Sequence, residues 1–126
     1  MLRRLAHEYG AIYDVRMPDD VQGAWIGKKR LMLVDDRLDD VQRRCVIAHE
    51  LSHAKHGDAG CRCDRWIERR ADMEASAMLI DIVQYAFVEQ VYGGNIAGMA
   101  RELNVVPWVI RAFRERLHDD PSLIVQ

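Results

Sequence analysis

Cysteines, prolines and long apolar runs are scarce in this chain of 126 residues. The three cysteines are an odd number, which excludes a framework in which every cysteine is paired within the chain. No run approaches the roughly 18 apolar residues of a membrane span, and no long apolar core follows the first five residues. We therefore expect neither a membrane span nor a signal peptide, and a reducing cytoplasmic compartment.

A surplus of positive charge is also missing. The 18 lysines and arginines are balanced by 20 aspartates and glutamates, which gives a formal net charge of -2. This balance argues against strong non-specific binding to nucleic acid, because such binding needs an excess of basic residues. The length and the 49% share of hydrophobic residues suit one globular domain over residues 1–126.

The pattern of apolar residues predicts an α+β fold. We expect a small antiparallel sheet of about three strands packed on a helix, followed by a mostly helical C-terminal part. A helix over residues 2–9 precedes a strand over residues 11–17. The apolar runs at residues 24–26 and 31–34 flank a loop that opens with Gly27, which predicts a hairpin.

Local signals predict the helices that follow the sheet. Asp39 and Gln42 form a capping-box pattern, which predicts a helix over residues 40–56 that Gly57 ends. The apolar face of the next segment predicts one long helix over about residues 65–92.

The motif that carries chemistry is His49-Glu50-Leu51-Ser52-His53, an HExxH sequence inside the helix predicted over residues 40–56. Since residues four apart lie on one helical face, the imidazoles of His49 and His53 can bind the same ion. Glu50 then faces the same cleft without being a ligand. In a zinc site of this type the metal lowers the pKa of its bound water, and the carboxylate accepts the proton.

A catalytic zinc site also needs a third protein ligand and an open fourth position. Glu68, early in the next predicted helix, is the best candidate, and Asp72 lies four residues further along the same face. Asp72 would then accept the N–H of a ligating histidine. The alternative is that Glu68 and Asp72 pair only with Arg65 and Arg69 on a solvated face.

The order of these motifs resembles the ImmA/IrrE family of small zinc metallopeptidases. A strand is followed by residues 48–53, then by Glu-Arg-Arg-Ala-Asp at 68–72, then by residues 75–80. The resemblance is strong over about residues 2–82 and looser over the helical tail. Many relatives follow the second helical motif with a Met-Pro pair, whereas residues 81–82 here are expected to continue the helix.

What the resemblance implies is a zinc-dependent endopeptidase with a gluzincin-like site. His49, His53 and Glu68 would hold one zinc ion, and Glu50 would be the general base. Relatives encoded by phages and mobile elements act on a partner repressor of the helix-turn-helix type, so such a repressor is the expected substrate. The strand over residues 31–34 would be the edge that an extended peptide joins by backbone pairing.

Several other residues are weaker candidates for the same site. His56 could line the cleft or help to hold an oxyanion, but a solvent-facing place at the helix end fits it equally well. No oxyanion donor can be identified from the sequence. The possible donors are Tyr13, Tyr85 and Tyr92, but a tyrosine in such a position is more often a core residue.

The cysteines offer a second candidate metal site. Cys61 and Cys63 lie near His56, but no fourth ligand is evident, so free loop thiols are the expectation. Cys45 lies four residues before His49 and is expected to be a buried core thiol.

The tail over residues 94–126 leaves a DNA-binding function open. Helices expected at residues 96–103 and 107–118 are spaced like a helix-turn-helix, but from residue 96 onward four arginines face four acids. Since this balance is a poor electrostatic footprint for DNA, a packing or docking hairpin is favoured over a DNA-binding regulator. The remaining rival is a binding module that relieves repression without turnover, which would have no need of Glu50.

Overall fold

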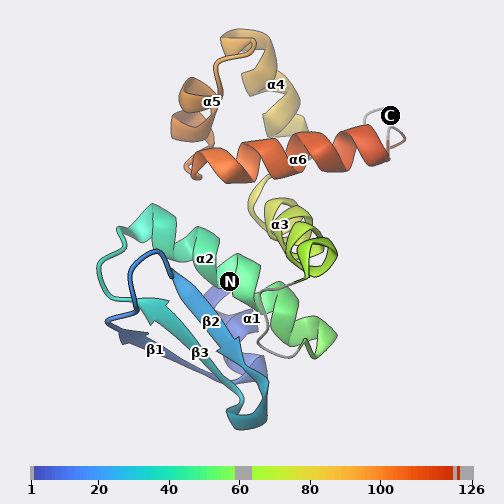
Figure 1. Cartoon of the computed structure of the whole chain (residues 1–126). Helices are drawn as coiled ribbons and strands as arrows, with labels where there is room; N and C mark the ends of the chain where they lie inside the picture. The colour runs from blue at the N-terminus through green and yellow to red at the C-terminus, as the bar shows by residue number, and fades with distance from the viewer. Residues whose placement is uncertain (1, 59–63, 121, 123–126) are drawn as a thin grey trace.

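The computed structural model describes residues 2–58, 64–120 and 122. Within these ranges a small sheet and two helices precede a group of four more helices (Figure 1). In chain order the elements are α1 (Leu2–Tyr9), β1 (Ala11–Val15), β2 (Gly23–Ile26), a 3-10 turn (Gly27–Lys29), β3 (Leu31–Asp35), α2 (Asp40–His56), α3 (Arg65–Leu79), α4 (Ile82–Tyr92), α5 (Ile96–Leu103) and α6 (Pro107–Asp119). The predicted α+β class is confirmed.

The sheet is mixed, which corrects the antiparallel sheet predicted from the sequence. Its strand order is β1-β3-β2. The hairpin is present, with β2 antiparallel to β3 and Gly23 opposite Val34. In contrast, β1 runs parallel to β3, with Ala11 opposite Leu31. The strand predicted to be a free edge, residues 31–34, is therefore the central strand, and its backbone is paired on both sides.

The segment at residues 16–22 carries the chain past the end of β3, from one edge of the sheet to the other. Arg37 ties this crossing to the sheet, because its Nε donates to the buried carboxylate of Asp35 at 3.0 Å and its Nη2 donates to the carbonyl of Met17 at 3.0 Å. The hydrogen bond from Arg37 lowers the pKa of Asp35, although burial acts in the opposite direction.

Helix α2 begins and ends where local signals predict. Asp39 accepts from the backbone N–H of Gln42, whose side chain accepts from the N–H of Asp39, and Gly57 ends the helix in the left-handed conformation at φ 66°. One side of α2 packs on the sheet, with α1 beside it (Figure 1). The core between them contains Ala6, Trp25, Met32, Val34, Val46, Ile47, Leu51 and Ala54.

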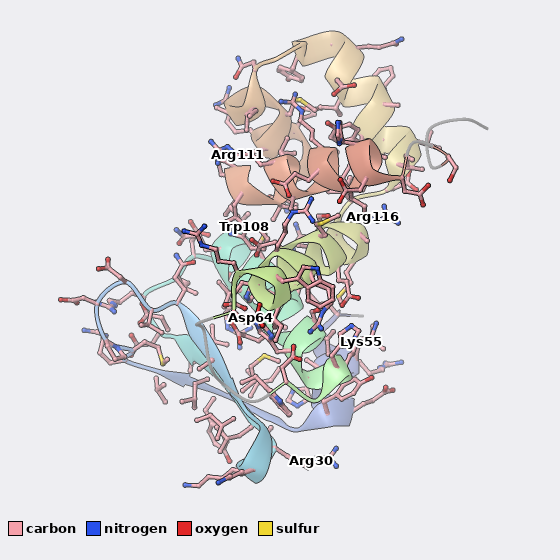
Figure 2. The ribbon with its side chains drawn as sticks, turned by 45° about the vertical axis from the view of Figure 1, so that its right-hand side comes forward. Arg30, Lys55, Asp64, Trp108, Arg111 and Arg116 are labelled. Atoms are coloured by element: carbon pink, nitrogen blue, oxygen red, sulfur yellow. The ribbon has the colours of Figure 1, made fainter. Side chains whose placement is uncertain are left out.

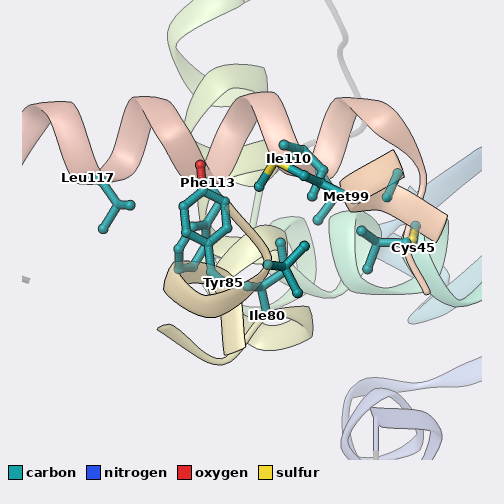
Figure 3. Packing of buried hydrophobic residues seen from close by; sticks show 11 residues of the cluster. Cys45, Ile80, Tyr85, Met99, Ile110, Phe113 and Leu117 are labelled. Atoms are coloured by element: carbon teal, nitrogen blue, oxygen red, sulfur yellow. The ribbon is translucent and has the colours of Figure 1, made fainter. Parts of the chain in front are cut away.

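The long helix predicted over residues 65–92 is wrong, since the chain breaks into α3 and α4. Ile80 is extended, at φ -121° and ψ 128°, and the side chain of Asp81 accepts from the N–H of Gln84 to cap α4. At this break the side chain of Ile80 points into a second hydrophobic core, which Figure 3 shows beneath α6. This core contains Cys45, Ile80, Tyr85, Val88, Met99, Ala100, Val105, Val109, Ile110, Phe113 and Leu117.

The two predicted tail helices are confirmed as α5 and α6. Asn104 ends α5 in the left-handed conformation, and Pro107 occupies the first turn of α6. Cys45 is fully buried, as predicted, and burial raises the pKa of its thiol. Cys61 and Cys63 lie outside the described residues. None of the described helices has both the length and the apolar character that crossing a membrane requires.

Candidate metal centre

Three side chains from two helices converge on one point. His49 and His53 come from adjacent turns of α2, and Glu68 comes from the first turn of α3. The Nε2 atom of His53 lies 3.2 Å from Nε2 of His49 and 2.6 Å from Oε2 of Glu68, and His49 Nε2 lies 3.6 Å from the same oxygen. Zinc–nitrogen bonds of about 2.0–2.1 Å place tetrahedral ligand atoms about 3.3 Å apart, so this spacing suits one zinc ion.

Both histidine rings are held by carboxylates on their far sides. Nδ1 of His49 donates to Asp72 at 2.7 Å, and Nδ1 of His53 donates to Asp58 at 2.9 Å. A carboxylate only accepts, so each Nδ1 carries the proton and each Nε2 presents its lone pair to the point of convergence. Arg70 also contacts Asp58, and together with His53 it lowers the pKa of that carboxyl against the effect of burial.

A buried carboxylate oxygen and the negative charge around His49 also fit a bound cation. Oε2 of Glu68 is buried and has no hydrogen-bond partner among the described residues, which is costly unless a ligand satisfies it. Burial lowers the pKa of His49, but its hydrogen bond to Asp72 and the charges of Glu50, Asp72 and Glu68 outweigh this and raise it overall. This excess of negative charge around buried lone pairs favours a metal ion, and a nitrogen and carboxylate donor set suits zinc.

Glu50 lies in the cleft beside these atoms. It is 3% exposed, and it lines the cleft together with Gln22, Gly23, Val46, His49, Glu68, Asp72 and Trp108. Gly23 allows α2 to approach the sheet at this point, because a Cβ atom there would lie 2.6 Å from Val46 and 3.4 Å from the Cγ atom of Glu50. A buried carboxylate next to a three-ligand cluster is the arrangement of a metal-assisted hydrolase.

The comparison with protein families agrees with this geometry. The pattern of the peptidase family M78, described as the IrrE N-terminal-like domain, matches residues 4–105, which is most of the chain. The chain belongs to this family. The resemblance to ImmA/IrrE metallopeptidases drawn from the motifs is thereby confirmed. A comparison with curated proteins finds no match.

Two residues of this M78 family member that sequence reasoning missed adjoin the metal cluster. Asp58 lies just after α2, and only its position five residues beyond His53 hints at the contact. Trp108 lies on the side of α6 that faces α2 and α3 (Figure 2), and its ring stands edge-on to that of His49 with the ring centroids 6.0 Å apart. Nothing in the sequence links Trp108 to His49, because they are 59 positions apart.

The weaker candidates lie elsewhere. His56 pairs with Glu74 at 2.9 Å and does not line the cleft, and Ser52 donates to the same carboxylate. Tyr85 is buried in the second core and donates to Glu89. Tyr13 is exposed on β1, and Tyr92 faces Glu102 near the end of α4. None of the four adjoins the cluster of His49, His53 and Glu68 in the described part of the chain.

Proposed function

We propose that this chain is a zinc-dependent endopeptidase that cleaves and inactivates a partner transcriptional repressor of the helix-turn-helix type. The observation that carries the proposal is the convergence of His49, His53 and Glu68 beside the buried carboxylate of Glu50 in one cleft. A pure binding surface would not need a buried carboxylate next to a metal cluster, since burying a charged group costs free energy.

His49, His53 and Glu68 would hold the ion, which when bound would polarise the scissile carbonyl and acidify water. Glu50 accepts the proton of the attacking water and then donates it to the amine that leaves. Asp72 and Asp58 keep the two imidazoles oriented, since each accepts a hydrogen bond from the Nδ1–H group of one ring. The low exposure of Glu50 keeps bulk water away from this proton transfer.

An extended substrate has a backbone edge to pair with beside the cleft. In the described residues β2 is bonded to β3 on one side only, and Gly23 of β2 and the adjacent Gln22 both line the cleft. Addition of a peptide strand to this edge would supply main-chain hydrogen bonds without selecting a sequence. Selectivity for one partner must then come from side-chain pockets around the cleft.

A repressor as the partner is supported by the family and by the charge of the chain. Relatives in the ImmA/IrrE family that phages and mobile elements encode act on helix-turn-helix repressors. The formal net charge of -2 favours a protein partner over direct contact with DNA. By this proposal the chain controls a phage or mobile-element switch, and it reaches DNA only through the repressor.

The test is incubation of the zinc-loaded chain, at less than one equivalent, with the helix-turn-helix repressor encoded nearest to its gene. We expect the wild type to give fragments, Glu50→Gln to retain zinc without cleaving, and Glu68→Ala to lose zinc. Glu8→Gln, an exposed glutamate on α1, is the matched control and should cleave normally. Full cleavage by Glu50→Gln would refute the mechanism, and a stable one-to-one complex without fragments would favour the rival binding module.

A further inference from the structure

A groove between α3 and α6 continues from the cleft that His49, Glu50 and Glu68 line, which we call the metal cleft. Each helix contributes one face with the same spacing of three, four and seven residues: Arg65, Glu68, Arg69 and Asp72 from α3, and Trp108, Arg111, Ala112 and Glu115 from α6. The groove and the metal cleft adjoin, because they share three lining residues: Glu68, Asp72 and Trp108. Trp108 and Arg111 are one helical turn apart, and Figure 2 labels both at the N-terminal end of α6.

The charges in this groove are unevenly matched. All three acids are already engaged: Glu68 belongs to the candidate metal cluster with His53, Asp72 accepts a hydrogen bond from His49, and Glu115 accepts one from Arg69 at 2.9 Å. Arg69 is occupied further by Asp119, at 2.8 Å. Arg65 and Arg111 are exposed, and neither forms an ion pair with any residue that the structure describes. Two uncommitted guanidinium groups are therefore available beside the metal cluster.

We infer that Arg65 and Arg111 bind a carboxylate of the peptide that occupies the metal cleft, and so select acidic substrates. This inference rests on the proposed peptidase function. A guanidinium group presents paired N–H donors that match a carboxylate, and Arg65 and Arg111 come from two helices, so they can bind it from two directions. The carboxylate is either an aspartate or glutamate side chain near the scissile bond or the C-terminus of the peptide.

A single carboxylate fits the groove better than the backbone of a nucleic acid. Glu68, Asp72 and Glu115 line the same space, and their charges would repel a chain of phosphates. The family match ends at residue 105, before α6 begins at Pro107. Arg111 therefore lies outside the residues that the family model matches, whereas Arg65 lies within them.

Peptide hydroxamates test this inference without turnover, because the hydroxamate binds the zinc and the attached peptide reaches into the groove. Three forms of the peptide separate the two sources of carboxylate. The neutral form has a glutamine and an amidated C-terminus, the second form has a glutamate in place of the glutamine, and the third keeps the glutamine but has a free C-terminal carboxylate. At low ionic strength we expect the zinc-loaded wild type to bind at least one acidic form about tenfold more tightly than the neutral form.

In the double variant Arg65→Gln with Arg111→Gln, the acidic and neutral forms should bind with about equal affinity, and the affinity for the neutral form should be that of the wild type. Arg116→Gln is the matched control, since Arg116 lies further along α6 and lines a different surface, and it should keep the preference.

Equal binding of all three forms by the wild type would overturn the inference and leave the metallopeptidase proposal standing. A preference unchanged in the double variant would also overturn it, as would a short single-stranded DNA that displaces the acidic hydroxamate. Failure of the zinc-loaded chain to bind any hydroxamate would instead refute the proposed function, and the inference with it.

Discussion

Nδ1 of His49 lies 2.7 Å from Oδ1 of Asp72, so the first histidine of the motif is oriented by a residue on the next helix. The second histidine is oriented differently, by Asp58 in the segment just after α2. Each ring therefore has its own carboxylate, and the two carboxylates come from different parts of the chain. This arrangement directs both Nε2 atoms to one point, which would lower the cost of binding an ion there.

Substitution of Asp72 tests this orientation. Asp72→Ala should lower zinc affinity about 10–100-fold, because His49 loses the acceptor that holds its tautomer and ring angle. Competition with a chromophoric chelator measures the change. Asp19→Asn is the control, since Asp19 is almost fully exposed and forms only a 3.8 Å pair with Arg37. Unchanged affinity in Asp72→Ala would show that the helix alone orients His49.

Gly23 is expected to be intolerant of even one added methyl group. In Gly23→Ala the new Cβ atom would lie 2.6 Å from the Cγ1 atom of Val46 and 3.1 Å from the carbonyl oxygen of Leu33, so the Val46 side chain or α2 itself must move. We expect a loss of about 1–3 kcal/mol in the free energy of unfolding, measured by urea denaturation. Gly94→Ala is the control, because nothing lies within 4 Å of a Cβ atom there. Equal stability of the two variants would contradict the close packing at Gly23.

The stability that Asp35 contributes should depend on pH in a defined direction. Its pKa in the folded state is lowered by Arg37, from about 3.9 in an unfolded chain. The contribution is therefore complete above the unfolded value and is lost as the pH falls through the folded value. We expect Asp35→Asn to lower the Tm most above about pH 5, and the difference from wild type to shrink toward about pH 3. A difference that stays constant over this range would refute the role of the charge.

The chain contains only two phenylalanines, and they form a matched pair for testing the second core. Phe113 is 0% exposed and its ring centroid lies 4.7 Å from that of Tyr85, whereas Phe87 on α4 is 68% exposed. Phe113→Ala should cost about 3–5 kcal/mol in the free energy of unfolding. Phe87→Ala should change it by less than about 0.5 kcal/mol, because little area is removed from contact. A similar loss in both variants would indicate that α4 is covered in solution.

The ends of several helices were predictable because the signals that set them are local. The capping box of Asp39 and Gln42, the glycine at position 57 and Pro107 each act within one turn of the helix they begin or end. The break at Ile80 had a similar signal in Asp81 and Gln84, which resemble an N-cap pair. The apolar face that runs on from α3 into α4 obscured it, since burial in two different cores gives one continuous hydrophobic pattern.

The pairing of strands was not predictable in the same way. A hairpin between β2 and β3 follows from adjacency in the sequence, whereas the parallel pairing of β1 with β3 depends on the crossing that Asp35 and Arg37 hold. Because of that crossing, residues 31–34 form the central strand of the sheet and not the edge strand that the sequence predicted. The free edge beside the cleft is therefore β2, which changes where an extended peptide can bind.

The same distinction between local signals and tertiary packing applies to the residues of the candidate site. The sequence by itself determined that His49, Glu50 and His53 share one neighbourhood, because helical periodicity places them there whatever the rest of the chain does. Glu68 and Asp72 followed from the same periodicity on the next helix, but only the packing of α3 on α2 decided that they meet the histidines. Asp58, Trp108 and the uncommitted arginines could be found only in the tertiary structure, since contacts between segments far apart depend on how whole elements pack.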